Sequence, residues 1–185
     1  MSKKKLALVF ILMLLGVGGV FLWQKNQKDV AELNKDLPDG IRVVKNLQGE
    51  YWVVNKLDGY EFKIPEKWSG IEEIEYVPER TEENYTWNSI NLEGKEGFGR
   101  VAGINRFKLQ RDSTNLERWA RNSLSFSGLE SDLFIDQINE FEIIKTGKQI
   151  GIVGYIYFFQ KDLSVYTVSC GSGEFIQEII SSGKW

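Results

Sequence analysis

Histidine is absent from the sequence, and cysteine occurs once, as Cys170, among 185 residues. Without histidine the chain has no Ser–His or Cys–His nucleophilic pair and no histidine-ligated metal centre. A single cysteine also excludes a disulfide within the chain. Proline is scarce, with three residues, whereas 42% of the residues are hydrophobic and 13% are aromatic. This composition is typical of a protein with a folded core, and the length fits one domain of roughly 100 to 200 residues.

An uncharged, predominantly apolar segment covers residues 6–23, LALVFILMLLGVGGVFLW, and it directly follows a lysine triplet at residues 3–5. As a helix it is roughly 27 Å long, close to the hydrocarbon thickness of a bilayer, about 30 Å. Because the apolar residues continue up to Trp23, the segment favours a retained anchor over a cleaved secretory signal. The lysine triplet favours a cytoplasmic N-terminus. We therefore expect a single-pass cell-membrane protein with a cytoplasmic basic tail at 1–5, a transmembrane signal anchor at 6–23, a tether at 24–40 and an extracytoplasmic domain at 41–185.

Acidic residues dominate the part of the chain that follows the apolar segment. The net charge of the whole chain is −3, but all 26 acidic residues lie from Asp29 onward, whereas five of the 23 basic residues precede it. The remainder therefore has 18 basic and 26 acidic residues, a net charge of −8. Both signs are intermixed along it, without a basic stripe. Such a module has no electrostatic basis for binding nucleic acid.

Turn residues divide the domain into β-rich segments. Residues 51–55 and 60–64 flank Asp58-Gly59, a dipeptide that is a strong signal for a β-hairpin. The segment 130–139 is compatible with a short helix or a loop. Further strands are expected at 71–77, 85–92, 99–109, 141–146, 149–160 and 163–170.

Two helices are predicted among these strands. Thr114 and Glu117 form a capping box, after which apolar residues recur at helical spacing up to Phe126. Ser172 precedes a second helix with one apolar face, made of Phe175, Ile176, Ile179 and Ile180. The order of strands, helix, strands and helix, with short connections between the late strands, predicts an α+β fold with a mostly antiparallel sheet.

Several short motifs resemble PsbP-like domains, a family named for an extrinsic subunit of photosystem II. They are a strand pair with Asp58, Gly59, Tyr60, Phe62, Ile64, Pro65 and Trp68, a central helix at 114–126 with Trp119-Ala120, a late strand with Val165-Tyr166-Thr167-Val168, and a closing helix at 175–182 followed by Trp185. The resemblance covers about Gln48 to Trp185. It implies an α/β/α sandwich, with helices on both faces of an antiparallel sheet, and a binding or assembly role without established active-site chemistry.

The chain departs from the family in two respects. A membrane anchor replaces the lipid-attachment cysteine or transit peptide, and no histidine is present to supply metal ligands. A photosynthetic role is therefore not implied, and no residue's function carries over, because the matching residues belong to the core.

Two groups of residues invite a chemical role. Cys170 precedes the second predicted helix, whose N-terminal dipole can lower the pKa of a nearby thiol. Because no histidine can act as its base and no second cysteine can resolve a disulfide, we interpret Cys170 as a small buried residue at a strand end. The glutamates between Glu72 and Glu83 lack the alternate oxygen ligands and the glycine bend of a calcium loop, so they predict a solvated face. We expect neither a metal nor a cofactor.

Tyr85 and Trp87 are the candidate binding residues. They lie in a polar stretch, Asn84-Tyr85-Thr86-Trp87-Asn88, where aromatic rings beside amides can stack on a sugar or peptide or anchor a protein interface. The alternative is that both rings alternate inward on a strand and belong to the core. We expect a non-enzymatic binding or assembly module that contacts an envelope protein or a small ligand. The alternative function is a membrane-anchored hydrolase that uses carboxylate or thiol chemistry.

Overall fold

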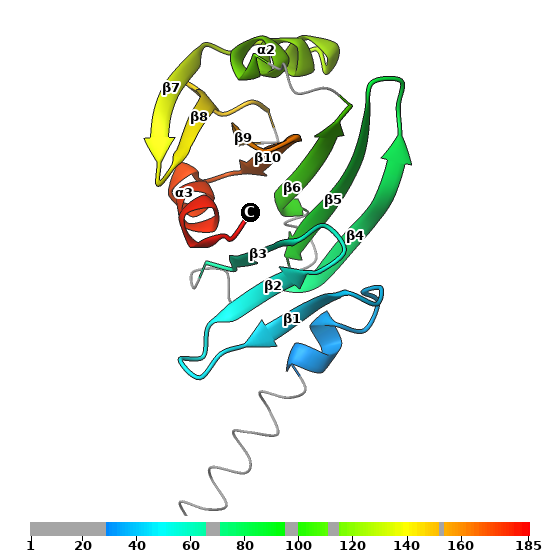
Figure 1. Ribbon diagram of the computed structural model, residues 1–185. Helices are drawn as coiled ribbons and strands as arrows, with labels where there is room; N and C mark the ends of the chain where they lie inside the picture. The colour runs from blue at the N-terminus through cyan, green and yellow to red at the C-terminus, as the bar shows by residue number, and fades with distance from the viewer. Residues whose placement is uncertain (1–28, 66–70, 95–99, 111–114, 152–153) are drawn as a thin grey trace, which may run out of the picture.

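The computed structural model describes residues 29–65, 71–94, 100–110, 115–151 and 154–185. These residues form two antiparallel β-sheets and short helices (Figure 1). The smaller sheet has the strand order β1 (Ile41–Lys45), β2 (Tyr51–Asn55) and β3 (Tyr60–Lys63). Residues 29–33 form a short helical segment beside β1.

The larger sheet has seven strands, and their order in space differs from their order along the chain. One half consists of β4 (Ile71–Thr81), β5 (Tyr85–Gly94) and β6 (Arg100–Leu109). The other half consists of β7 (Leu133–Ile138), β8 (Phe141–Thr146) and β9 (Tyr155–Lys161). The last strand, β10 (Ser164–Cys170), lies between β6 and β9 and joins the halves, so that β4 and β7 are the two edges. The helix α2 (Leu116–Phe126) connects β6 to β7, and α3 (Gly173–Ser182) follows β10.

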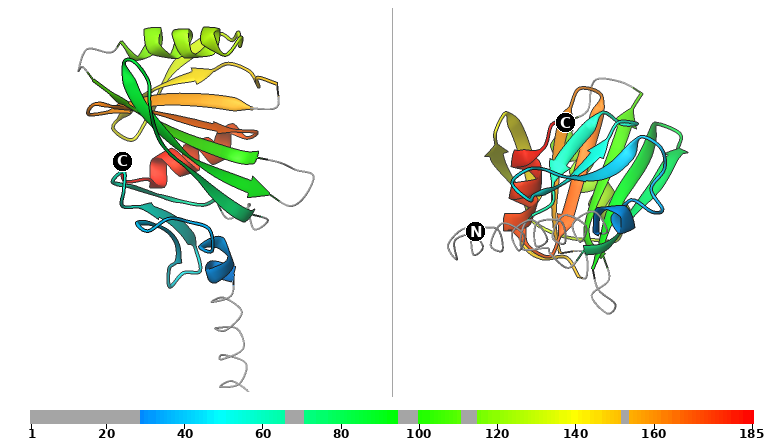
Figure 2. Two further views of the ribbon diagram at one scale, coloured as in Figure 1. Left: turned by 90° about the vertical axis from the view of Figure 1, so that its right-hand side faces the viewer. Right: turned by 90° about the horizontal axis from the view of Figure 1, so that it is seen from below.

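A different layer covers each face of the seven-stranded sheet (Figure 2). On one face lies α2, whose apolar stripe forms a core with β8, β9 and β10; this core includes Leu116, Ala120, Leu124, Ile144, Phe158 and Val165. The opposite face is covered by α3 and by the three-stranded sheet. These share a second core, which includes Val43, Val53, Phe62, Ile104, Phe159, Ile176, Ile179 and Ile180.

The expected α/β/α sandwich, with helices covering both faces of the sheet, is wrong. The structure is mostly antiparallel β-sheet, and α2 and α3 have only 11 and 10 residues. Seven strands spaced about 4.8 Å apart are roughly 29 Å wide, whereas a helix of that length extends roughly 15 Å. One such helix cannot cover a face of the sheet. The layer beside α3 is completed by strands, of which β1 was not expected.

The expected membrane anchor at 6–23 lies outside the described residues, together with the basic tail at 1–5 and the start of the tether. Among the residues that the structure describes, no helix combines the length and the apolar character needed to cross a membrane.

Local turn and helix signals are confirmed in several places. Asp58-Gly59 joins β2 to β3, and the positive φ of Gly59, 80°, is the conformation that glycine allows in such a turn. The helix expected at 114–126 is α2, whose N-cap is Asn115: its side chain accepts a hydrogen bond from the N–H of Arg118 at 2.8 Å. The ambiguous segment 130–139 contains β7, so neither the helix nor the loop was right.

Candidate functional site

Tyr85 and Trp87 both lie on β5, on the face of the sheet that carries α2. The ring of Tyr85 contacts Phe107 of β6 edge-on, with 5.5 Å between centroids. Phe107 in turn contacts Trp119 of α2 at 4.7 Å. Tyr85 therefore belongs to an aromatic cluster that holds α2 on the sheet.

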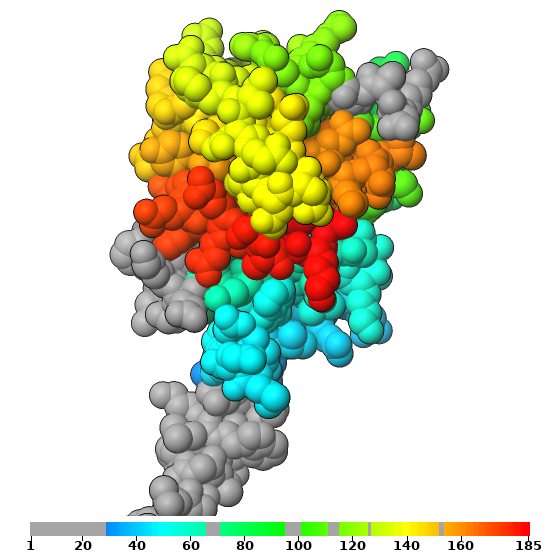
Figure 3. All heavy atoms as spheres, turned by 60° about the vertical axis from the view of Figure 1, so that its left-hand side comes forward, coloured from blue at the N-terminus to red at the C-terminus, as the bar shows by residue number. Residues whose placement is uncertain are grey.

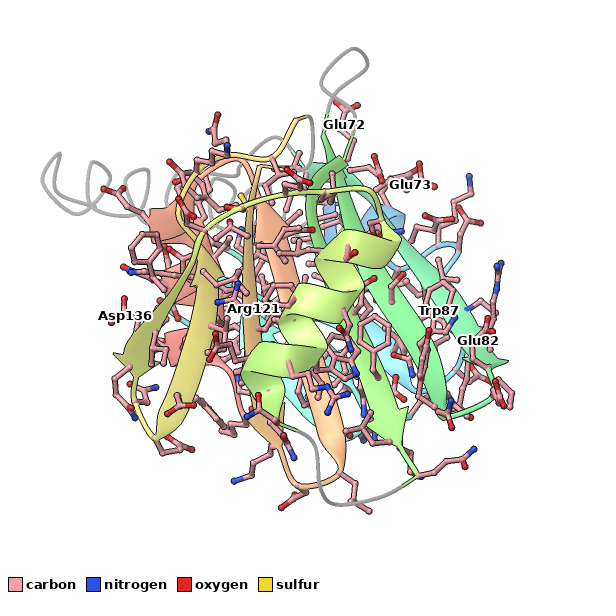
Figure 4. All side chains as sticks on the ribbon, turned by 90° about the horizontal axis from the view of Figure 1, so that it is seen from above. Glu72, Glu73, Glu82, Trp87, Arg121 and Asp136 are labelled. Atoms are coloured by element: carbon pink, nitrogen blue, oxygen red, sulfur yellow. The ribbon has the colours of Figure 1, made fainter. Side chains whose placement is uncertain are left out.

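Trp87 lies beyond this cluster, to the side of α2 (Figure 4). It pairs across the strands with Arg80 of β4 and with Phe107 of β6, and the Arg80 guanidinium lies 5.5 Å from the centre of its ring. The half-buried indole therefore keeps one partly accessible, cation-flanked face. Its role in binding stays a prediction.

The thiol of Cys170 lies at the end of β10 and is buried, with 3% exposure. Burial raises its pKa, although the N–H of Ser172 donates a hydrogen bond to the sulfur at 3.3 Å. Because only the thiolate is a strong nucleophile, this environment disfavours covalent chemistry at Cys170. The acidic segment is a solvated face as predicted, with exposed glutamates at 72, 73, 75, 79, 82 and 83. Across the described ranges, no group of three or more carboxylates or thiols is arranged to hold a metal ion.

A buried polar cluster, which sequence reasoning missed, is centred on Asp58. The carboxylate accepts hydrogen bonds from Arg106 Nη1 at 2.9 Å, Asn88 Nδ2 at 2.8 Å and Asn55 Nδ2 at 2.6 Å. Arg106 also donates through Nε to Ser164 Oγ at 3.1 Å. The side chains of Asp58 and Arg106 are only 6% and 15% exposed. Because Asp58 lies between β2 and β3 whereas Asn88 and Arg106 lie on β5 and β6, the cluster joins the two sheets.

The strand β7 is the second feature that sequence reasoning missed, and it has exposed apolar residues. Phe134 is 52% exposed and Ile135 is 66% exposed, although β7 pairs with β8 along its whole length. Successive residues of a strand point to opposite faces, so these two side chains lie on both sides of one sheet edge. An apolar edge of this kind is a surface that proteins usually cover.

Two grooves lie where β7 and β8 meet α3, and Glu174 and Gln177 of α3 line both of them. The first has a volume of about 480 Å³ and is lined by Asp136 and Glu178, among others. The second has a volume of about 420 Å³ and is lined by Phe134, Lys145, Tyr155 and Tyr157, among others. In Figure 3 the hairpin of β7 and β8, in yellow, lies directly against α3, in red.

An ion pair between Lys145 and Asp136 bridges β8 and β7 beside these grooves. The hydrogen bond from Lys145, with a second one from the backbone N–H of Gln137, lowers the pKa of Asp136. The same pair raises the pKa of Lys145. Of the described residues that line the two grooves, Lys145 is the one cation, and Asp136, Glu174 and Glu178 are the carboxylates. The surface beside β7 is therefore apolar at the strand edge and acidic toward α3.

Comparison with known proteins adds no relative. The chain matches no protein-family model, no curated protein and no solved structure. The resemblance to PsbP-like domains therefore stays a prediction from short motifs.

Proposed function

We propose that the chain is a non-enzymatic binding module, anchored in a cell membrane through residues 6–23, whose extracytoplasmic domain binds a partner protein at the β7 edge. One observation carries the proposal: β7 is a sheet edge with two exposed large apolar side chains, Phe134 and Ile135, beside two grooves against α3. Edges and apolar patches of this kind are typical of protein interaction sites.

The residues best suited to chemistry support a binding role over hydrolysis. Cys170 is buried with a raised thiol pKa. Asp58 and Arg106 are bonded to each other and to neighbouring polar side chains. A hydrolase would need a concave site where such groups converge on a substrate. Cys170, Asp58 and Arg106 do not form such a site, because each is buried among other protein groups.

The binding surface is tested with the full chain, purified in detergent and immobilised, which captures proteins from solubilised membranes of its source. The surface variant carries Phe134→Ser and Ile135→Ser. The matched control is Leu47→Ser, because Leu47 is an equally apolar, fully exposed residue in the turn between β1 and β2. We expect a protein that the wild type and the control capture and the surface variant does not.

A parallel Trp87→Ala variant examines the surface expected from the sequence. A partner that this variant alone fails to capture would move the binding site to β5. A partner that every variant retains would contradict the β7 surface. The orientation is tested separately: protease added to intact cells should remove the domain, and a protected domain would contradict an extracytoplasmic location.

A further inference from the structure

We infer that β7 binds its partner by strand addition, and that the added strand is an extended segment of the partner in which basic and apolar residues alternate. This inference rests on the proposed function and names the class of its ligand. It is carried by the contrast between the two sheet edges, by the direction of the backbone groups of β7, and by the charges that flank them.

The two edges of the seven-stranded sheet differ in how they resist pairing. Proteins protect edge strands with proline, charged residues and bulges. The edge strand β4 has all three: Pro78, several exposed glutamates, and register shifts between Ile71 and Glu73 and between Val77 and Arg80. The edge strand β7 has no proline and pairs with β8 over six residues without a register shift. Of the two edges, β7 is the one that remains open to another strand.

The backbone hydrogen bonds of the hairpin determine which groups of β7 face outward. The N–H of Gly147 donates to the carbonyl of Asp132 at 2.9 Å, so these two residues form a hydrogen-bonded pair in the register of β7 and β8. Bonded and non-bonded pairs alternate along an antiparallel ladder. The N–H and C=O groups of Leu133, Ile135 and Gln137 therefore point away from β8. The N–H of Gln137 is occupied, because it donates to the Asp136 carboxylate at 2.8 Å. The backbone groups of Leu133 and Ile135 remain directed at an added strand.

The two faces beside this edge differ in chemistry. On the α3 side lie Phe134 and the ion pair of Asp136 with Lys145, and beyond them the helix contributes Glu174 and Glu178, the latter with Lys63 at 3.5 Å. On the other side lies Ile135, opposite Ile144 of β8. Because side chains of a strand alternate between faces, a strand added here would place every second side chain near the carboxylates and the others near Ile135. Basic and apolar residues are complementary to those two environments.

Charge also distinguishes this partner from a second copy of the chain. Pairing β7 with β7 of another molecule would bring Asp136 and the acidic α3 side of both copies together. Residues from Asp29 onward carry a net charge of −8, so the two domains would repel each other. A basic segment meets no such repulsion.

The test measures binding of short fluorescent peptides to the full chain in detergent micelles, by fluorescence anisotropy. The probe alternates lysine and valine. One control peptide has glutamate in place of lysine, and another has the probe sequence with alternate backbone amides N-methylated, which removes the donors that strand pairing needs. We expect the probe to bind, and each control peptide to bind roughly tenfold more weakly or worse.

Two protein variants complete the design. Ile135→Pro removes an N–H that faces away from β8, in a position where an edge strand tolerates proline. Ile135→Ala removes more of the side chain than Ile135→Pro does but keeps the N–H. We expect Ile135→Pro to weaken probe binding roughly tenfold more than Ile135→Ala does. An unchanged circular dichroism spectrum shows that the variants are folded. The N-methylated peptide tests the need for backbone hydrogen bonds without any protein variant.

The outcomes separate this inference from the proposed function. Suppose that Phe134→Ser with Ile135→Ser abolishes capture of a partner, but the probe and the N-methylated peptide bind equally well. That result would support the β7 binding surface and overturn strand addition. Absence of probe binding, or equal binding of the glutamate peptide, would overturn the basic segment. A dimer in analytical ultracentrifugation that Ile135→Pro dissociates would assign the edge to a second copy. A partner retained by all variants would overturn both proposals.

Discussion

Replacing Asp58, in the turn between β2 and β3, with alanine should strongly destabilise the fold. Its carboxylate is 6% exposed and accepts hydrogen bonds from Arg106 and from two buried asparagine amides, Asn55 and Asn88. After Asp58→Ala the guanidinium, only 15% exposed, loses its carboxylate partner and keeps its hydrogen bond to Ser164 Oγ. The two amides also lose their acceptor.

The expected magnitude follows from what the substitution leaves behind. Removing one partner of a buried ion pair costs about 3 to 5 kcal/mol, because the other charge stays buried without compensation. Each buried donor without an acceptor costs about 1 to 3 kcal/mol when the structure cannot relax. These effects overlap, since the cluster can rearrange around the gap. We therefore expect Asp58→Ala to lower the free energy of unfolding by about 4 kcal/mol.

Urea titration of the full chain, followed by tryptophan fluorescence, measures this loss. The control is Asp39→Ala, which removes an exposed aspartate near a turn and should cost less than about 0.5 kcal/mol. The slope of the unfolding free energy against urea concentration should not change, because both variants expose the same surface on unfolding. In a double-mutant cycle, Arg106→Ala should cost less in the Asp58→Ala background than in the wild type. A loss below about 1 kcal/mol for Asp58→Ala, or additive effects, would refute the role of the cluster.

The remaining predictions concern the room for a side chain at two glycines, the pH dependence of an ion pair, and the accessibility of the Cys170 thiol. In urea titrations, Gly154→Ala should destabilise the fold far more than Gly59→Ala. Both glycines have a φ of 80°, so the backbone strain of the two substitutions is similar. A Cβ at Gly154 would lie 2.2 Å from the carbonyl oxygen of Cys170, whereas a Cβ at Gly59 would meet nothing within 4 Å. Equal losses would contradict this reasoning. The lowered pKa of Asp136 and the raised pKa of Lys145 make their ion pair stabilising between the two transitions. The difference in Tm between wild type and Asp136→Asn should therefore shrink below about pH 4, as the carboxylate is protonated, and above about pH 10, as the amine loses its proton. A difference in Tm that does not change with pH would exclude the ion pair as its source. Cys170 should react with a thiol reagent only after denaturant is added, and fast labelling of the folded chain would contradict its burial.

The sequence was most informative where structure depends on neighbours along the chain. Asp58-Gly59 predicted a hairpin because a tight turn selects residues for its own backbone geometry. The apolar spacing that follows Asn115 predicted α2 because one helical stripe is visible within a few turns. The sequence of β7, LFIDQI, lacks a clean alternation, and its strand conformation depends on pairing with β8. That information is absent from a local window.

The candidate site was out of reach for a related reason. Asp58 was visible as a turn residue, but two of the three side chains that donate to it lie 30 and 48 residues away, in β5 and β6. Asp136 and Glu174 line one groove only because β7 and α3 pack side by side. Tyr85 and Trp87 were correctly expected on one strand face, but the sequence gives no sign that Phe107 and Trp119 pack around Tyr85.

The position of the domain's N-terminal end determines which surfaces a partner can reach. Residues 29–33 lie beside β1, at the opposite end of the molecule from α2 (Figure 1). With the proposed anchor in a bilayer, the three-stranded sheet is the layer nearest the membrane, and α3 separates it from β7. Under that proposal Phe134 and Ile135, exposed on β7, would lie away from the bilayer. In that arrangement the proposed partner protein at β7 accounts for exposed apolar residues on an otherwise acidic domain better than membrane contact does.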